Sequence, residues 1–168
     1  MELNLYLCEQ CGNLVNLIKN SGIPLVCCRQ KMVQTAPDSI DISGELQFYY
    51  CEDCKNMVIL LKDSGVPFKC CGCPMIRISP NTEDASLEKH VPIWKKEGSL
   101  VQIAVGAAEH PMEQKHFIEW ILLKTKKNLF CKTLLPGETP AASFSLSEGD
   151  EVEAVYAFCN LHGLWAAK

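Results

Sequence analysis

Two cysteine-containing segments of this chain repeat each other without a gap, 43 residues apart. The segment YLCEQCGNLVNLIKNSGIPLVCCRQKM at 6–32 matches YYCEDCKNMVILLKDSGVPFKCCGCPM at 49–75, and 14 of the 27 positions are identical. Each copy contains C-x-x-C, fifteen further residues and then two adjacent cysteines. We interpret the segments as a duplicated module, which is too small to hold itself together by apolar burial alone.

The repeated cysteines predict two four-cysteine metal sites. A C-x-x-C turn directs two sulfurs at one point, and the adjacent pair supplies two more, which makes a tetrahedral site suited to zinc or iron. A disulfide between adjacent cysteines would need a strained ring, and isolated buried thiols would not repeat at one spacing. The predicted ligands are Cys8, Cys11, Cys27 and Cys28 in the first copy, and Cys51, Cys54, Cys70 and Cys71 in the second.

Two further cysteines lie outside the repeated ligand pattern. Cys73 corresponds to Gln30 of the first copy, so we assign it as a spare thiol beside a metal site, with ligand exchange as the alternative. Cys131, in NLFCK, is expected to be a strand residue without a role.

The chain changes character from about residue 88. Short apolar or alternating runs, separated by turn signals such as LPGETP and SEGD, predict an antiparallel β-sandwich of about 80 residues. A single histidine is more often a surface or core residue than a ligand, but all four histidines of the chain lie here, beside a C-x-x-H step. That combination favours a mixed nitrogen–sulfur site, for which zinc would be the first choice. The candidate ligands are His90, His110, His116, Cys159 and His162.

Composition and charge exclude some partner classes. The net charge is -4, whereas proteins that bind nucleic acid phosphates are usually basic. The apolar runs are shorter than the roughly 20 residues of a spanning helix, and MELNLYLCEQC lacks the pattern of a secretory signal. We therefore expect a cytoplasmic protein with no membrane or nucleic-acid partner, whose reduced cysteines bind metal.

Both copies resemble the desulforedoxin module, a rubredoxin-type unit that holds iron through four cysteines, two of them adjacent. Each copy lacks one glycine of that pattern, since Lys55 and Arg29 stand where the other copy has Gly12 and Gly72. The rest of the chain resembles the iron domain of the superoxide reductases, the desulfoferrodoxin and neelaredoxin family. The motifs that carry this second resemblance are EKHVP (88–92), HPMEQKHFIEW (110–120), LLPGETPAASF (134–144) and YAFCNLHGLW (156–165).

The resemblance implies a mainly β fold, with two small desulforedoxin-like four-cysteine modules followed by an immunoglobulin-like antiparallel β-sandwich. The spacing from Met75 to His90 implies that the second copy is the family's usual N-terminal module and the first an addition. The expected segments are a first module (1–34), a linker (35–44), a second module (45–76), a linker (77–87) and the superoxide reductase iron domain (88–168).

For the site, the resemblance implies that the four histidines bind iron in an equatorial plane and Cys159 binds it axially, with the sixth position open. Lys89, next to the ligand His90, would attract superoxide and help the reduced product receive a proton. Glu88 would resemble the carboxylate that caps the ferric iron after peroxide has left, and Lys115 would add to the positive field.

The implied reaction reduces superoxide, with one electron and two protons, to hydrogen peroxide while ferrous iron becomes ferric. A rubredoxin-like protein would supply electrons, and the four-cysteine centres, with iron or zinc, would store or relay them without being essential. We expect a homodimer, in which the repeats pair either within one chain or between chains. The alternatives are an electron-transfer iron protein with incidental superoxide reactivity and a zinc-bound four-cysteine interaction module.

Overall fold

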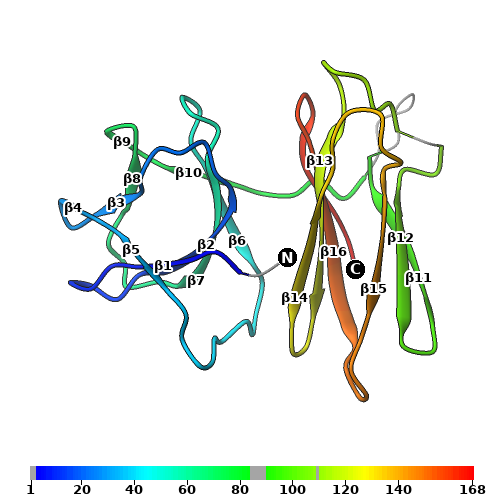
Figure 1. Cartoon of the computed structure of the whole chain (residues 1–168), viewed down its shortest axis with the longest axis horizontal. Coiled ribbons are helices and arrows are strands. Elements are labelled where there is room, and N and C mark those ends of the chain that lie inside the picture. The colour runs from blue at the N-terminus through cyan, green and yellow to red at the C-terminus, as the bar shows by residue number, and fades with distance from the viewer. Residues whose placement is uncertain (1–2, 84–89, 109) are drawn as a thin grey trace. The chain divides into compact units, whose positions relative to one another are not determined.

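The computed structural model describes residues 3–83, 90–108 and 110–168, and the chain is mainly β (Figure 1). Seventeen strands and no helix occur in these ranges, so none of their segments is a helix able to cross a membrane. The chain divides into two compact units, with the boundary between Ser79 and Pro80. Both repeats therefore lie in one N-terminal unit, and the four histidines lie in the other.

The N-terminal unit contains ten short strands. They are β1 (Leu5–Leu7), β2 (Leu14–Lys19), β3 (Val26–Cys27), β4 (Gln30–Lys31), β5 (Val33–Thr35), β6 (Gln47–Tyr50), β7 (Met57–Lys62), β8 (Lys69–Cys70), β9 (Cys73–Pro74) and β10 (Ile76–Ile78). Six of them form a sheet in the order β10-β6-β7-β2-β1-β5, and the other four form the order β4-β3-β8-β9. The apolar runs of β2 and β7 take the centre of the larger sheet, where strands rich in Val, Ile and Leu are favoured.

The two repeats pair with each other through a pseudo-two-fold axis inside one chain. On β2 and β7, Asn16 lies opposite Ile59, which is its own counterpart 43 residues on. On β3 and β8, Val26 likewise lies opposite its counterpart Lys69. A self-complementary contact of this kind is what joins the subunits of a two-fold dimer. One buried cluster then spans both repeats, including Val15, Leu17, Val58 and Leu60.

Regular structure extends beyond the expected module boundaries. Thr35 ends β5, and Arg77 and Ile78 belong to β10, although we had placed these residues in linkers. Each edge strand pairs with the first strand of its own repeat, β5 with β1 and β10 with β6. Backbone N–H and C=O groups find ladder partners there that a free linker would lack. Asn81, also in an expected linker, belongs to the C-terminal unit and forms a β-bridge with Trp165 of the same unit.

The C-terminal unit is built from two antiparallel sheets around one core. Its strands are β11 (Pro92–Glu97), β12 (Leu100–Val105), β13 (Ile118–Thr125), β14 (Leu129–Thr133), β15 (Ala141–Ser145), β16 (Val152–Cys159) and β17 (Gly163–Ala167). One sheet has the order β11-β12-β15 and the other β14-β13-β16-β17. Ile103 of the first sheet and Ile121, Leu123 and Val155 of the second share a buried cluster, so the sheets pack face to face.

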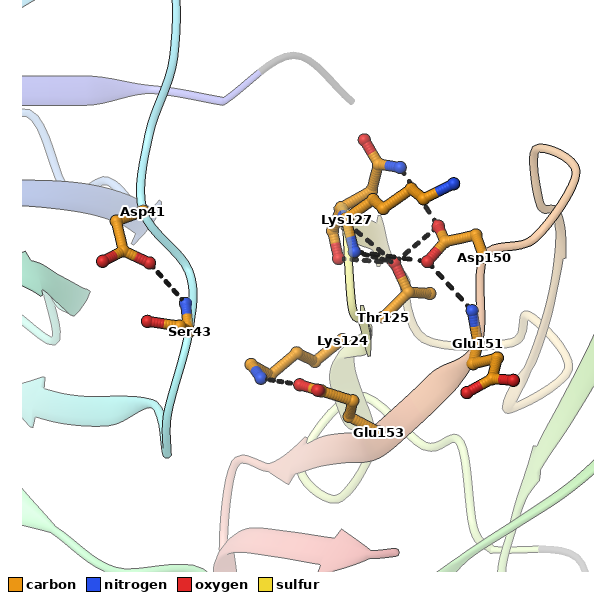
Figure 2. A network of polar contacts seen from close by, with 9 residues as sticks. Asp41, Ser43, Lys124, Thr125, Lys127, Asp150, Glu151 and Glu153 are labelled. Atoms are coloured by element: carbon orange, nitrogen blue, oxygen red, sulfur yellow. Dashed lines mark hydrogen bonds and ion pairs between the residues drawn. The ribbon is translucent and has the colours of Figure 1, made fainter.

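Asp150 fastens the β13–β14 turn to the start of β16, at the end of β13 remote from His116 (Figure 2). Its carboxylate accepts hydrogen bonds from Thr125 Oγ1 at 2.8 Å, Asn128 Nδ2 at 3.1 Å and the Lys127 backbone N–H at 3.2 Å. Burial alone would raise the pKa of Asp150, but these hydrogen bonds outweigh it and hold the pKa below its usual value.

We expect Asp150→Asn to lower the free energy of unfolding by about 2 kcal/mol, because the amide nitrogen cannot accept the hydrogen bonds of buried donors. Since the folded pKa is lowered, the carboxylate stabilises the fold above the ordinary carboxyl pKa of about 4, and this stabilisation is lost as the pH falls through the lowered value. Denaturant titrations at neutral and acidic pH should show the difference from wild type shrinking on acidification. Asp41→Asn, at an exposed carboxylate, is the control with little expected effect; a pH-independent difference for Asp150→Asn would contradict the prediction.

Candidate metal centres

The four histidines form a nearly square array of imidazole rings. Neighbouring ring centroids are 4.6–4.8 Å apart, and the centroids of His90 and His116, across the diagonal, are 6.3 Å apart. Neighbouring rings are inclined by 69–80° to each other. Half the diagonal is about 3 Å, the separation expected between a ring centroid and a metal ion bound through a ring nitrogen at about 2 Å. The square is therefore sized for one central ion.

The sulfur of Cys159 joins this array. Its Sγ lies 3.6 Å from His162 Nδ1, and one ligand atom from each of the five predicted residues lies within 4.8 Å of all the others. Cys159 is fully buried, whereas His162 is exposed. The Cys159 sulfur therefore adds a fifth donor atom to the four imidazoles. Imidazole with thiolate is a donor set that suits iron as well as zinc.

The β16–β17 hairpin fixes two of the five side chains. Cys159 is the last residue of β16 and pairs with Gly163, the first of β17, so residues 160–162 form the loop. Gly163 has a φ of +79°, a left-handed conformation that glycine adopts without a steric penalty. The C-x-x-H step is thus a three-residue hairpin loop that carries a sulfur at one end and an imidazole at the other.

Asn160 links this hairpin loop to the segment that carries His116. Its side-chain oxygen accepts a hydrogen bond from the Phe117 N–H at 2.9 Å, and its amide donates to the Lys115 carbonyl oxygen at 3.0 Å. The backbone N–H of Asn160 donates to the Phe117 carbonyl oxygen at 3.2 Å. The loop pairs with the chain beside it, which residue spacing alone does not reveal.

Trp165 supports two further ligands, a role that we did not predict. Its ring stacks on His90, with centroids 4.7 Å apart and planes inclined by 16°. Its Nε1–H donates to the His162 carbonyl oxygen at 3.2 Å. A tryptophan three residues after a candidate ligand, on the strand leaving the loop, was the available sequence signal. Contacts of this kind orient ligands and are commonly as important for affinity as the ligands themselves.

We expect Asn160→Ala to accelerate release of the metal from the histidine site to a chelator roughly 10- to 100-fold, the usual cost of losing an outer-shell contact. The reason is that both hydrogen bonds to the His116 segment are lost. Asn160→Asp keeps the acceptor for Phe117 and should give an intermediate rate. Leu161→Ala, at a 60% exposed position of the same loop, is the control. Equal release rates for Asn160→Ala and the control would refute the bracing role.

The eight repeated cysteines form two clusters of four, one in each repeat. In the first, Cys27 Sγ lies 3.5 Å from Cys11 Sγ and 4.0 Å from Cys28 Sγ. In the second, Cys54 and Cys70 have sulfurs 3.3 Å apart. A tetrahedron with metal–sulfur bonds of about 2.3 Å has sulfurs about 3.8 Å apart, so both clusters fit one ion. Cys73 is exposed and is not part of the second cluster.

Without an ion, the four thiols of a cluster do not ionise together. A hydrogen bond from the Ser64 side chain is the main cause that lowers the pKa of Cys11 to about 6. Burial is the main cause that raises the pKa of Cys28 to about 11. A bound cation supplies the positive charge that four thiolates at one point require. Cys131 has no such surroundings; burial raises its pKa to about 12, which makes it an inert thiol.

The turns beside the clusters keep one backbone conformation whether or not glycine is present. Arg29 has a φ of +65° and Gly72, at the equivalent position, +81°; Lys55 has +65° and Gly12 +83°. The two departures from the glycine pattern therefore leave the turns in the same left-handed region. A non-glycine residue in that region costs roughly 1–2 kcal/mol.

We expect Arg29→Gly to raise the free energy of unfolding by roughly 0.5–1 kcal/mol, because relief of the left-handed strain exceeds the added flexibility of the unfolded chain. Gly72→Arg is the matched reverse change. A Cβ at Gly72 would meet no heavy atom within 4 Å, so its cost is conformational alone. Thermal unfolding of the metal-loaded protein measures both, and shifts of the same sign would contradict the explanation.

Of the three charged residues that we assigned to the catalytic site, the structure describes one. Glu88 and Lys89 lie outside the described residues, so their roles remain predictions. Lys115 is exposed, next to His116, and its carbonyl oxygen is held by Asn160.

Comparison with known proteins agrees with this architecture. The Desulfoferrodoxin family profile matches residues 82–168, and the profile of its N-terminal domain matches residues 1–34. This chain belongs to the desulfoferrodoxin family. The N-terminal match falls on the first repeat, whereas we had expected the second to be the family's usual module.

Individual relatives cover nearly the whole chain. The desulfoferrodoxin of Syntrophotalea carbinolica is 42% identical over 167 residues, and that of Nitratidesulfovibrio vulgaris is 40% identical; the alignments span 99% of this chain and 97% of each relative. The crystal structure of the superoxide reductase from Treponema pallidum superposes with a TM-score of 0.65 at 32% identity, covering 74% of this chain and 98% of that one.

Proposed function

We propose that this protein is a superoxide reductase that acts at an iron ion bound by His90, His110, His116, His162 and Cys159. The observation that carries the proposal is the square of four imidazoles with a buried cysteine sulfur beside it. Family membership and the similarity to the Treponema pallidum enzyme support the same function. When bound, ferrous iron supplies the electron that converts superoxide and two protons to hydrogen peroxide, and it becomes ferric.

The protein's own residues would prepare the centre in three ways. The four imidazoles would hold the ion, and the thiolate of Cys159 would donate electron density to it. A position not taken by these five ligands would be left for a small oxidant. Four neutral imidazoles and one thiolate carry a single negative charge, so a ferrous centre keeps one net positive charge, which attracts an anion.

Two charged residues next to His90 complete the proposal. Lys89 would add to the attraction for superoxide and supply a proton to the reduced product, and Glu88 would cap the ferric iron once peroxide has left. Their support is their position immediately before a ligand. Lys115 would add a smaller contribution from the His116 side.

The N-terminal unit is proposed to contain two desulforedoxin-like iron centres that arose by duplication, with zinc as the alternative metal. Its support is the repeated ligand spacing and the pseudo-two-fold pairing of the copies. The C-terminal domain, with its seven antiparallel strands in two sheets, is proposed to be immunoglobulin-like.

A rubredoxin-like donor is proposed as the electron source. Leu161 is 60% exposed directly between the ligands Cys159 and His162, and it offers an apolar contact to a docking protein close to the ion. A homodimer is also proposed, and light scattering giving a clean monomer mass would exclude it. Because the repeats already pair within one chain, the dimer would not depend on their pairing between chains.

We expect anaerobically prepared protein to contain three irons and to absorb visible light, and the reduced protein to be oxidised rapidly by a pulse of superoxide. Lys89→Ala should lower the second-order rate constant about tenfold or more and weaken its dependence on ionic strength, because electrostatic steering is lost. Lys115→Ala is the matched control, with a smaller effect.

Two results would count against the proposal. Protein that holds only zinc, without visible absorption, would favour the interaction module. A slow oxidation that is insensitive to Lys89→Ala would favour an electron-transfer protein with incidental superoxide reactivity.

A further inference from the structure

Two buried asparagines occupy equivalent positions in the repeats, and each contacts the opposite repeat. Asn13 and Asn56 are each the second residue after a C-x-x-C turn, and both are fully buried. Asn13 Nδ2 donates to the Val66 carbonyl oxygen at 2.7 Å, and Asn56 Nδ2 donates to the Ile23 carbonyl oxygen at 2.9 Å. Val66 is the counterpart of Ile23, so the two contacts are related by the pseudo-two-fold axis.

Each asparagine oxygen is also bound by the opposite repeat. Asn13 Oδ1 accepts hydrogen bonds from the Ser64 N–H and hydroxyl, both at 2.8 Å. Asn56 Oδ1 accepts one from the Ser21 N–H at 2.7 Å. Ser21 and Ser64 begin the S-G-I-P and S-G-V-P turns of the two repeats. The serine turn of each repeat therefore donates hydrogen bonds to the asparagine of the other repeat.

The same asparagines reach the metal-binding sulfurs of their own repeat. Asn13 Nδ2 lies 3.5 Å from Cys27 Sγ, and Asn56 Nδ2 lies 3.3 Å from Cys70 Sγ, both within the range of N–H···S hydrogen bonds. Each four-cysteine cluster thus contacts an asparagine of its own repeat, and the serine turn of the other repeat binds that asparagine.

We propose that the two four-cysteine sites are built reciprocally: the Ser21 turn of the first repeat positions the second site through Asn56, and the Ser64 turn of the second repeat positions the first site through Asn13. These four are positioning residues, since they act on the sulfurs that would hold the ion. The inference rests on the proposed metal sites but not on the proposed reaction with superoxide. It follows that one repeat by itself lacks the turn that holds its asparagine against the sulfur.

Hydrogen bonds to a metal-bound sulfur tune the metal, and their loss typically lowers metal affinity 10- to 100-fold. Here a change in one repeat acts on the ion of the other. An effect of a turn substitution on the metal site of the other repeat distinguishes a positioning role from a merely structural one. A substitution that only loosened the turn would first disturb the metal site of the repeat to which the turn belongs.

The test uses the full chain loaded with cadmium-113, whose NMR spectrum gives one resonance per four-cysteine site, assigned through couplings to the cysteine β-protons. We expect Ser64→Ala, which removes the hydroxyl that donates to Asn13, to shift the resonance of the Cys8, Cys11, Cys27 and Cys28 site. Ser21→Ala keeps the backbone N–H that donates to Asn56 and should leave the resonance of the second site in place. Cadmium release from the affected site to a chelator should accelerate roughly tenfold. The readout needs neither iron nor superoxide, so its failure is distinct from failure of the proposed function.

Asp63→Asn is the matched control in the same turn as Ser64. The Asp63 carboxylate accepts a hydrogen bond from the Gly65 N–H at 2.7 Å, within its own turn, so this variant should leave both resonances in place. Asn13→Asp should shift the resonance of the first site and Asn56→Asp that of the second, because each asparagine contacts a sulfur of its own repeat; if either fails to fold, Ser64→Ala decides. Ser64→Ala shifting the resonance of its own repeat, both resonances equally or neither would overturn the proposal.

Discussion

The convergence of several donor atoms on one point is the constraint on which this structure depends. Three groups of side chains bring four or five nitrogens and sulfurs within 4.8 Å of one another, and most of these side chains are partly or fully buried. Polar groups packed so closely away from water destabilise a fold unless something compensates them. A cation does so, and the strands and turns hold the donors where a cation can reach all of them.

The two units meet this constraint in different ways. In the C-terminal unit two sheets share an apolar core, and the ligands come from loops and strand ends that the core makes rigid. One end of β13 is held by the Asp150 network and the other leads from His116. In the N-terminal unit the repeats are too small for such a core, and buried cysteines are part of the cluster that joins them. There the metal sites and the fold cannot be separated.

Residue spacing predicted which sulfurs and nitrogens come together within each C-x-x-C, C-C and C-x-x-H step, because these steps are local and their geometry follows from one turn each. That His90, His110 and His116 join Cys159 and His162 was implied by the family resemblance. Residue spacing did not predict the contacts between segments. The repeated sequences of β2 and β7 are compatible with antiparallel pairing either within one chain or between two chains, so the sequence alone does not distinguish the two arrangements. The hydrogen bonds of Asn160 and Trp165 depend on which loop lies beside which strand. The short strands β5 and β10 were missed because VQT and IRI are followed directly by turn residues.

The covalent tether between the repeats has a consequence for how their two sites can differ. When identical subunits form a dimer, any substitution appears on both sides of the axis at once. In this chain a substitution appears on one side only. Arg29 occupies the turn position that is equivalent to Gly72, and Gln30 occupies the position equivalent to Cys73. The two four-cysteine sites therefore have different neighbouring residues although their backbones are related by the pseudo-two-fold axis. A substitution can change the surroundings of one site without changing those of the other.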